Sequence, residues 1–273
     1  MEQKTQRKFR LSFIVPVKYI KEYGDRSDFI LALPHLIDKE KETEYEKAIK
    51  ETGLPIWLDN GAFENKYPEG IDNLLIKAKK INAELIFSPD FWEDKTGTKR
   101  AFENFLYIAK KQRVNIKVGV VIQAKNWDEF VQFYEECIND KRVDVIGINH
   151  KTTSKIWRAK FKRRYSYDEN RMPDDRIEAL KFLGDKFKDK NRDVHLLGLG
   201  GGYEDVIYAS KNFPWVKSND TSAPFWSAVY GKKITEKGDF GGKIKKPLNF
   251  EYVANKVQLK LAEYNINKIK ELI

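Results

Sequence analysis

Apolar runs that alternate with amphipathic segments, repeated from Leu54 onward, are the feature that most limits the folds open to this chain. Each apolar run is short and continuous, which is typical of a strand buried on both faces. Each segment that follows carries apolar residues at helical spacing. Strand–helix units repeated without a reversal predict a parallel sheet covered by helices, and so many units favour a TIM-type (β/α)8 barrel.

The chain is expected to form a single domain, 1–273, without a linker. The pattern sets the expected boundaries of its strands and helices. Strands are predicted at 10–17, 54–58, 84–88, 116–122, 143–148, 194–199 and 215–217, with a short strand or loop at 29–36. Helices are predicted at 39–52, 71–82, 98–112, 127–139, 176–187 and 204–211, and a closing amphipathic helix at 250–273. The long polar crossing after the strand 143–148 is expected to be a basic loop insertion, 151–171.

Composition narrows the partners and the location. The net charge of +10 favours a polyanionic partner, nucleic acid first and an anionic membrane surface second, although a solvated lysine-rich surface explains it equally simply. A single cysteine, Cys137, excludes an internal disulfide and a multi-cysteine zinc site, and the three histidines lack metal-ligand spacing. We therefore expect no metal and no cofactor. The polar start and the lack of a long apolar run predict no signal peptide, no membrane contact and a cytoplasmic location.

Polar residues stand where the predicted strands end. In a barrel, these ends meet at one mouth, where catalytic side chains are found. The set is Asp59, Asp90, Gln123, Asn149-His150, the glycines of 198–202, and Asp220. The competing interpretation is structural, because an Asp there often caps the next helix and a glycine run often makes a tight turn. His195 is expected to be a buried core histidine, and neither it nor His150 is given a catalytic role.

The segment 151–167, KTTSKIWRAKFKRRYSY, is basic and interleaved with aromatic residues. Lys and Arg neutralise phosphates and aromatic rings stack on bases, so we expect it to grip a nucleic-acid backbone. A solvated charge run is the alternative. The residues expected to make the contacts are Lys155, Arg158, Lys160, Lys162, Arg163 and Arg164.

The strand-end motifs resemble those of the tRNA-guanine transglycosylases over roughly residues 54–224. Leu58-Asp59-Asn60-Gly61-Ala62-Phe63 is similar to their Asp-Ser-Gly-Gly-aromatic motif, and Ile122-Gln123 to their Val-Gln-Gly strand end. The stretch 197–202, LGLGGG, resembles their glycine loop, and 218–224, SNDTSAP, the segment with their nucleophilic Asp. No Cys or His follows Asp220, so their zinc subdomain is missing. This departure makes the chain most similar to the 7-deazaguanine DNA transglycosylases found in phages and bacterial genomic islands.

The resemblance implies a base exchange that replaces guanine in DNA with a 7-deazaguanine. Asp220 would attack C1′ and form a covalent glycosyl-enzyme, and Asp59 would act as general acid and base. The resemblance further implies a base pocket made by Asp90, Gln123, Gly198 and Phe63. DNA would be the partner, in the host cytoplasm if the chain is phage-encoded, and a helper protein could be needed.

Three alternatives stay open at this point. The first is a tRNA enzyme without its zinc module, with tRNA as the partner. The second is a non-catalytic barrel subunit that binds nucleic acid, which would need neither Asp59 nor Asp220. The third is an unrelated barrel isomerase or lyase, in which the glycine loop would bind phosphate.

Overall fold

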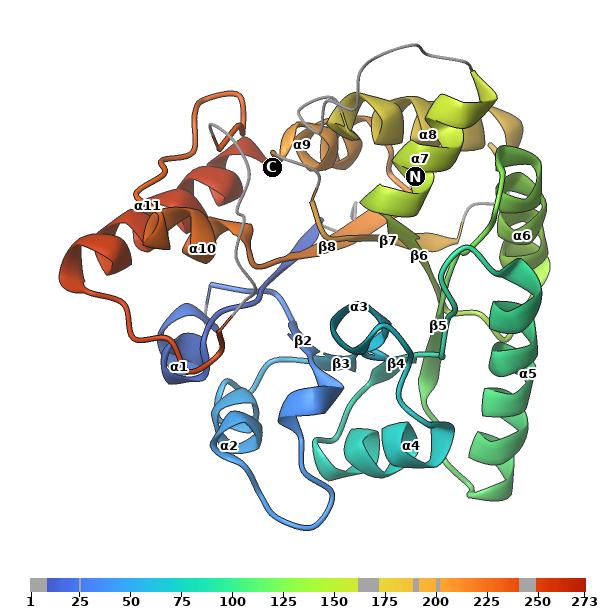
Figure 1. Cartoon of the computed structure of the whole chain (residues 1–273), viewed down its shortest axis with the longest axis horizontal. Coiled ribbons are helices and arrows are strands. Elements are labelled where there is room, and N and C mark those ends of the chain that lie inside the picture. Colours follow the sequence, from blue (N-terminus) through green and yellow to red (C-terminus); the bar gives the residue numbers. More distant parts are fainter. Residues whose placement is uncertain (1–8, 25, 162–171, 189–191, 200–201, 241–248) are drawn as a thin grey trace, which may run out of the picture.

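Eight parallel strands form a ring with helices around its outer face (Figure 1). This computed structural model describes residues 9–24, 26–161, 172–188, 192–199, 202–240 and 249–273. The strands are β1 (Arg10–Phe13), β2 (Ile30–Ala32), β3 (Ile56–Leu58), β4 (Leu85–Phe87), β5 (Lys117–Val121), β6 (Val145–Asn149), β7 (Asp193–Leu197) and β8 (Val216–Thr221). The TIM-type barrel predicted from the alternating pattern is confirmed.

At the seam between β1 and β2, side chains join the barrel together with a backbone hydrogen bond from the Asp28 N–H to the Leu11 carbonyl at 2.7 Å. Every other neighbouring pair of strands is joined by a parallel ladder, in the order β1-β8-β7-β6-β5-β4-β3-β2. At the seam, the Leu31 N–H donates to Oγ of Ser12 at 2.9 Å, and the Phe13 N–H donates to Oγ of Ser27 at 3.0 Å. Serine hydroxyls thus accept from backbone N–H groups that would otherwise be buried without a partner.

The apolar side chains fall into an inner and an outer layer. Alternation along each strand sends successive side chains to opposite faces, so Trp57 points into the barrel while Ile56 and Leu58 point to the helices. The inner layer consists of Phe29, Leu31, Trp57, Leu85, Phe87, Val121 and Val145. Both faces are therefore buried, which explains why the strands are apolar without interruption.

The helices follow the strands as expected, with four additions and some changes of boundary. They are α1 (Ile20–Gly24), α2 (Glu44–Glu51), α3 (Ala62–Asn65), α4 (Ile71–Lys80), α5 (Lys95–Lys111), α6 (Trp127–Asn139), α7 (His150–Lys160), α8 (Met172–Lys186), α9 (Glu204–Asn212), α10 (Ala223–Val229) and α11 (Lys256–Leu272), with short 3-10 helices η1 (Val17–Tyr19) and η2 (Pro34–Leu36). The pattern did not predict α1, α3, α7 or α10. The closing helix begins at Lys256 rather than at 250, because Asn255 caps it in a capping box with Gln258. No helix in the described ranges is long and apolar enough to cross a membrane.

The first part of the predicted basic loop, 151–171, is the helix α7, so that prediction is wrong for 151–160. Asn149 caps the helix by accepting from the Thr152 N–H at 2.8 Å, and Ile156 and Trp157 are buried against the barrel. These two apolar residues one turn into the segment give it a helical face, which the density of charge concealed. The remainder, 162–171, lies outside the described residues.

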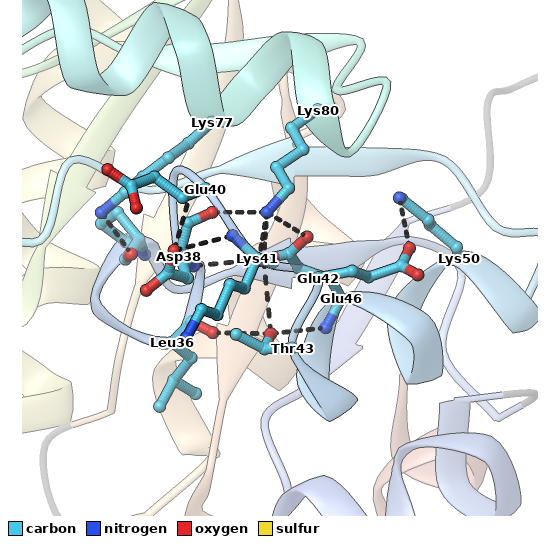
Figure 2. A network of polar contacts seen from close by, with 11 residues as sticks. Leu36, Asp38, Glu40, Lys41, Glu42, Thr43, Glu46, Lys50, Lys77 and Lys80 are labelled. Carbon is cyan, nitrogen blue, oxygen red and sulfur yellow. Dashed lines mark hydrogen bonds and ion pairs between the residues drawn. The ribbon is translucent and has the colours of Figure 1, made fainter.

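Two lysines of α4 hold the loop after β2 in place beside the barrel mouth (Figure 2). Nζ of Lys80 pairs with the fully buried Glu46 at 3.0 Å and donates to the carbonyl of Asp38 at 2.6 Å. Nζ of the buried Lys77 donates to the carbonyl of Pro34 at 2.8 Å. Pro34 in turn borders the turn that follows β3, so α4 fixes the wall behind the first candidate carboxylate.

Candidate active site

The turn after β3 presents Asp59 at the mouth of the barrel. Gly61 has a φ of 77°, and a β-carbon there would lie 2.9 Å from Cγ of Pro34, so the turn requires a glycine. The Gly61 N–H donates to Oδ2 of Asp59 at 3.1 Å. Partial burial raises the pKa of this carboxyl group to about 8, helped by the charges of Glu64, Asp90 and Asp220. Asp59 therefore carries a proton at neutral pH.

The second carboxylate, Asp220, rests on a histidine inside the barrel. Oδ1 of Asp220 lies 3.0 Å from Nε2 of His195, and the Gly198 N–H approaches the same oxygen at 3.4 Å. Nδ1 of His195 lies 2.9 Å from Oγ of Ser218. These partners fit one tautomer, in which Nε2–H donates to Asp220 and Nδ1 accepts from the serine.

His195 is part of the site as well as of the core. It is fully buried, and the rings of Phe29, Trp57 and Phe87 surround it at centroid distances of 5.9, 5.5 and 5.5 Å. The expectation of a core histidine is confirmed, but its contact with Asp220 was missed. The register that sets His195 against Ser218 creates the contact, and single-strand patterns do not reveal register.

Asp90 joins the ends of three neighbouring strands. It is buried, its Oδ1 accepts from Nδ2 of Asn60 at 2.6 Å, and its Oδ2 accepts from Nε2 of Gln123 at 2.5 Å. Burial raises its pKa to about 6 against the lowering effect of these two bonds. Oε1 of Gln123 accepts from the Glu93 N–H at 3.2 Å. The polar atoms expected to bind a base are thus engaged with one another, which makes this cluster a brace between β3, β4 and β5.

Aromatic side chains and one lysine form the rim above these carboxyl groups. Phe63 and Trp92 are 58% and 39% exposed, with ring centroids 6.3 Å apart. Nζ of Lys151, at the start of α7, lies 4.6 Å from the centroid of Phe63 and 5.9 Å from that of Trp92. Burial lowers the pKa of this lysine. Lys151 was predicted only as part of the basic segment 151–167, and Trp92 was not predicted as a site residue; its position shortly after a strand end was the one signal that pointed to it.

The basic residues of α7 pair with acidic side chains. Nζ of Lys155 lies 2.5 Å from Glu93, Nζ of Lys160 lies 2.8 Å from Asp128, and Arg158 pairs with Asp175. Lys162, Arg163 and Arg164 lie outside the described residues. That this segment contacts the backbone of a nucleic acid stays a prediction.

Metal binding has no support in the described part of the chain, where no group of three or more His, Cys, Asp and Glu side chains is arranged to hold an ion. Gly200 and Gly201 of the predicted glycine loop lie outside the described residues. Gly198, at the end of β7, has a φ of 61° and turns its N–H toward Asp220.

Comparison with known proteins corrects the family expectation. No model of a known protein family matches the sequence, and no curated protein matches it. A solved structure of N-acetylneuraminate lyase from Mycoplasma synoviae covers 96% of this chain and 98% of its own, with a TM-score of 0.50 and 12% sequence identity.

The assignment to the tRNA-guanine transglycosylases, the base exchange into DNA and the pentosyltransferase class that it implied are therefore wrong. Their motifs were short, and the structure shows why they misled. An Asp, a Gly or a Gln at a strand end can have a structural role instead, as the glycine-dependent turn at Gly61 and the brace around Asp90 show in this chain. At 12% identity the likeness to the Mycoplasma synoviae protein is one of fold.

Proposed function

We propose that this protein is an enzyme of the lyase type, in which Asp220 removes a proton from a small substrate and Asp59 donates one to the leaving group. The observation that carries the proposal is the difference between the two carboxyl groups. Asp59 holds a proton up to about pH 8, whereas Asp220 accepts hydrogen bonds from His195 and from the Gly198 N–H. A carboxyl group with a raised pKa can serve as the acid in a step for which a hydrogen-bonded carboxyl group is the base.

The proposed reaction needs no reactant other than the substrate and water. The carboxylate of Asp220 takes a proton from a C–H or O–H group of the substrate, and the electron pair left behind forms a C=C or C=O bond. The carbon that receives this electron pair loses its bond to the leaving group, and the leaving group takes the proton of Asp59. Asp220 then gives its proton to water, and Asp59 takes a proton from water, so both groups return to their starting states.

The charges at the mouth indicate which substrates fit. Asp59, Glu64, Asp90 and Asp220 interact there, and the raised pKa of Asp59 records their mutual repulsion and burial. Such a mouth favours a small neutral or positively charged molecule over an anion. The exposed rings of Phe63 and Trp92 offer it an apolar surface at the rim.

The fold supports the proposal only in part. The Mycoplasma synoviae protein is a lyase, so a barrel of this shape is compatible with the reaction class. The residues that would perform the reaction come from the geometry of this chain alone. The third alternative from the sequence, a barrel lyase or isomerase, is the one we carry forward, without its phosphate-binding glycine loop.

The proposal is tested by incubating the protein with hydroxy ketones, amino alcohols and polyols and following carbonyl or unsaturated products by proton NMR. We expect one class to be converted by the wild type, and Asp59→Asn and Asp220→Asn each to reduce the rate at least about a hundredfold. Asp72→Asn is the matched control, because Asp72 lies on α4 and accepts only from Gln112 at the surface. A rate that both site variants retain would contradict the proposal.

A further inference from the structure

Arg176 is a fully buried arginine behind the end of β7. It belongs to α8, and its Nε pairs with Asp205 of α9, which is equally buried. Nη1 donates to the carbonyl of Leu197 at 3.2 Å, and Nη2 donates to the carbonyl of Gly198 at 3.1 Å. All three nitrogens are therefore engaged, two of them with the backbone of the strand end that faces the candidate site.

The two carbonyls matter because of the peptide that joins Leu197 to Gly198. A trans peptide is planar, and its C=O and N–H point in opposite directions. When Arg176 holds the Leu197 carbonyl, the Gly198 N–H must point in the opposite direction, and Oδ1 of Asp220 lies 3.4 Å from it. The second bond, to the Gly198 carbonyl, fixes the next peptide, which Nδ2 of Asn219 also contacts at 3.4 Å.

The backbone at this point needs such support. Gly198 has a φ of 61°, and a β-carbon at this residue would approach Nδ1 of His150 to 3.2 Å. Glycine permits this conformation, but it also permits many others, because it has no side chain to restrict them. Something outside the glycine must select the one that aims the N–H at the carboxylate.

We propose that Arg176 is a positioning residue, which orients the Leu197–Gly198 peptide so that its N–H donates to Asp220. Arg176 touches neither Asp220 nor the space at the mouth, and it acts only through the backbone. Its importance for catalysis rests on the proposed function, whereas its effect on the Gly198 N–H does not.

The competing explanation is that the Arg176–Asp205 pair merely joins α8 to α9. Two variants separate the explanations. Arg176→Lys keeps a positive charge for Asp205 but cannot reach both carbonyls. The double variant Arg176→Met/Asp205→Met removes the pair without leaving a buried charge alone, so it is the one expected to fold if the lysine variant does not.

The readout is the proton chemical shift of the Gly198 amide, measured by NMR on the full chain. We expect Asp220→Asn and each Arg176 variant to move this signal upfield, because the amide loses its charged acceptor or its orientation. Adding Asp220→Asn to an Arg176 variant should move it little further, because both changes break the same bond. Arg142→Met, a surface change, should leave it in place.

An unchanged Gly198 signal in a folded Arg176 variant, or shifts that simply add to that of Asp220→Asn, would overturn the proposal. The same variants are then assayed for turnover. If the amide shifts in the variants but the wild type itself converts no substrate, the proposed lyase function is disproved and the positioning role of Arg176 stands.

Discussion

Nε2 of His195 lies 3.0 Å from Oδ1 of Asp220, so the carboxylate at the end of β8 rests on an imidazole inside the barrel. The ring is fixed from below by Ser218 and from the sides by aromatic rings. It cannot swing away from the carboxylate without opening the core. The orientation of the proposed base is thus set by packing as well as by hydrogen bonding.

Replacing His195 with Phe should separate these two contributions. Phe fills most of the same volume among the rings, but it cannot donate to Asp220, and it leaves the Ser218 hydroxyl without its partner. We expect a loss of stability of about 1–3 kcal/mol and a fall in turnover of about 10-fold or more. Thermal unfolding and steady-state kinetics measure the two effects. Full turnover in a folded His195→Phe protein would show that His195 does not support the proposed base.

Stability should depend on pH through Asp59. In the unfolded chain this group loses its proton near its ordinary pKa of 3.8, but in the folded chain near 8. Between these values the folded state binds one proton more, so the free energy of unfolding falls as pH rises from about 4 to 8. The Asp59→Asn variant lacks this contribution, so its stability relative to the wild type should rise as pH rises from about 4 to 8. Denaturant unfolding at several pH values checks this, and parallel curves for the two proteins would disprove it.

The turn after β3 should tolerate no β-carbon at Gly61. Gly61→Ala combines a positive φ with a contact to Cγ of Pro34, so we expect a loss of about 2–3 kcal/mol and a displaced Asp59. Gly53 is the matched control, because its φ is also positive, at 66°, while nothing lies within 4 Å of the added carbon. Gly53→Ala should cost only about 1 kcal/mol. Equal losses of unfolding free energy in the two variants would show that Pro34 gives way.

The two ion pairs of Figure 2 should differ in strength. Glu46 is fully buried and Lys80 mostly so, whereas Lys50 and Glu42 are both partly solvent-exposed. Lys80→Met leaves a buried charge without its cation and should cost about 3 kcal/mol, whereas Lys50→Met should cost less than about 1 kcal/mol. Adding Glu46→Gln to Lys80→Met should recover part of the loss. Chemical denaturation measures all three, and similar losses for the two lysine variants would contradict the assignment.

The sequence was sufficient to predict the barrel and to place Asp59 and Asp220 at the ends of strands. Unbroken apolar strands and helical spacing define the fold, and Asp59 and Asp220 stand where such strands end. The contacts that give the site its character are between residues distant in sequence, such as His195 with Asp220 and Arg176 with Leu197. They depend on strand register and helix docking, which local patterns do not encode. The helix α7 was missed for a different reason, because its charged residues hide a short buried face around Trp157.

The proposed chemistry requires Asp59 to hold a proton at neutral pH, while Asp220 is hydrogen-bonded to His195 and to the Gly198 N–H. Titration of the Asp59 side-chain carboxyl by carbon-13 NMR, in the wild type and in Asp220→Asn, tests it most directly. We expect a midpoint near pH 8 in the wild type and a lower one in the variant, because removing the Asp220 charge favours ionisation of Asp59. A midpoint near the ordinary value of 3.8 in the wild type would contradict the account, since Asp59 would then have no proton to donate.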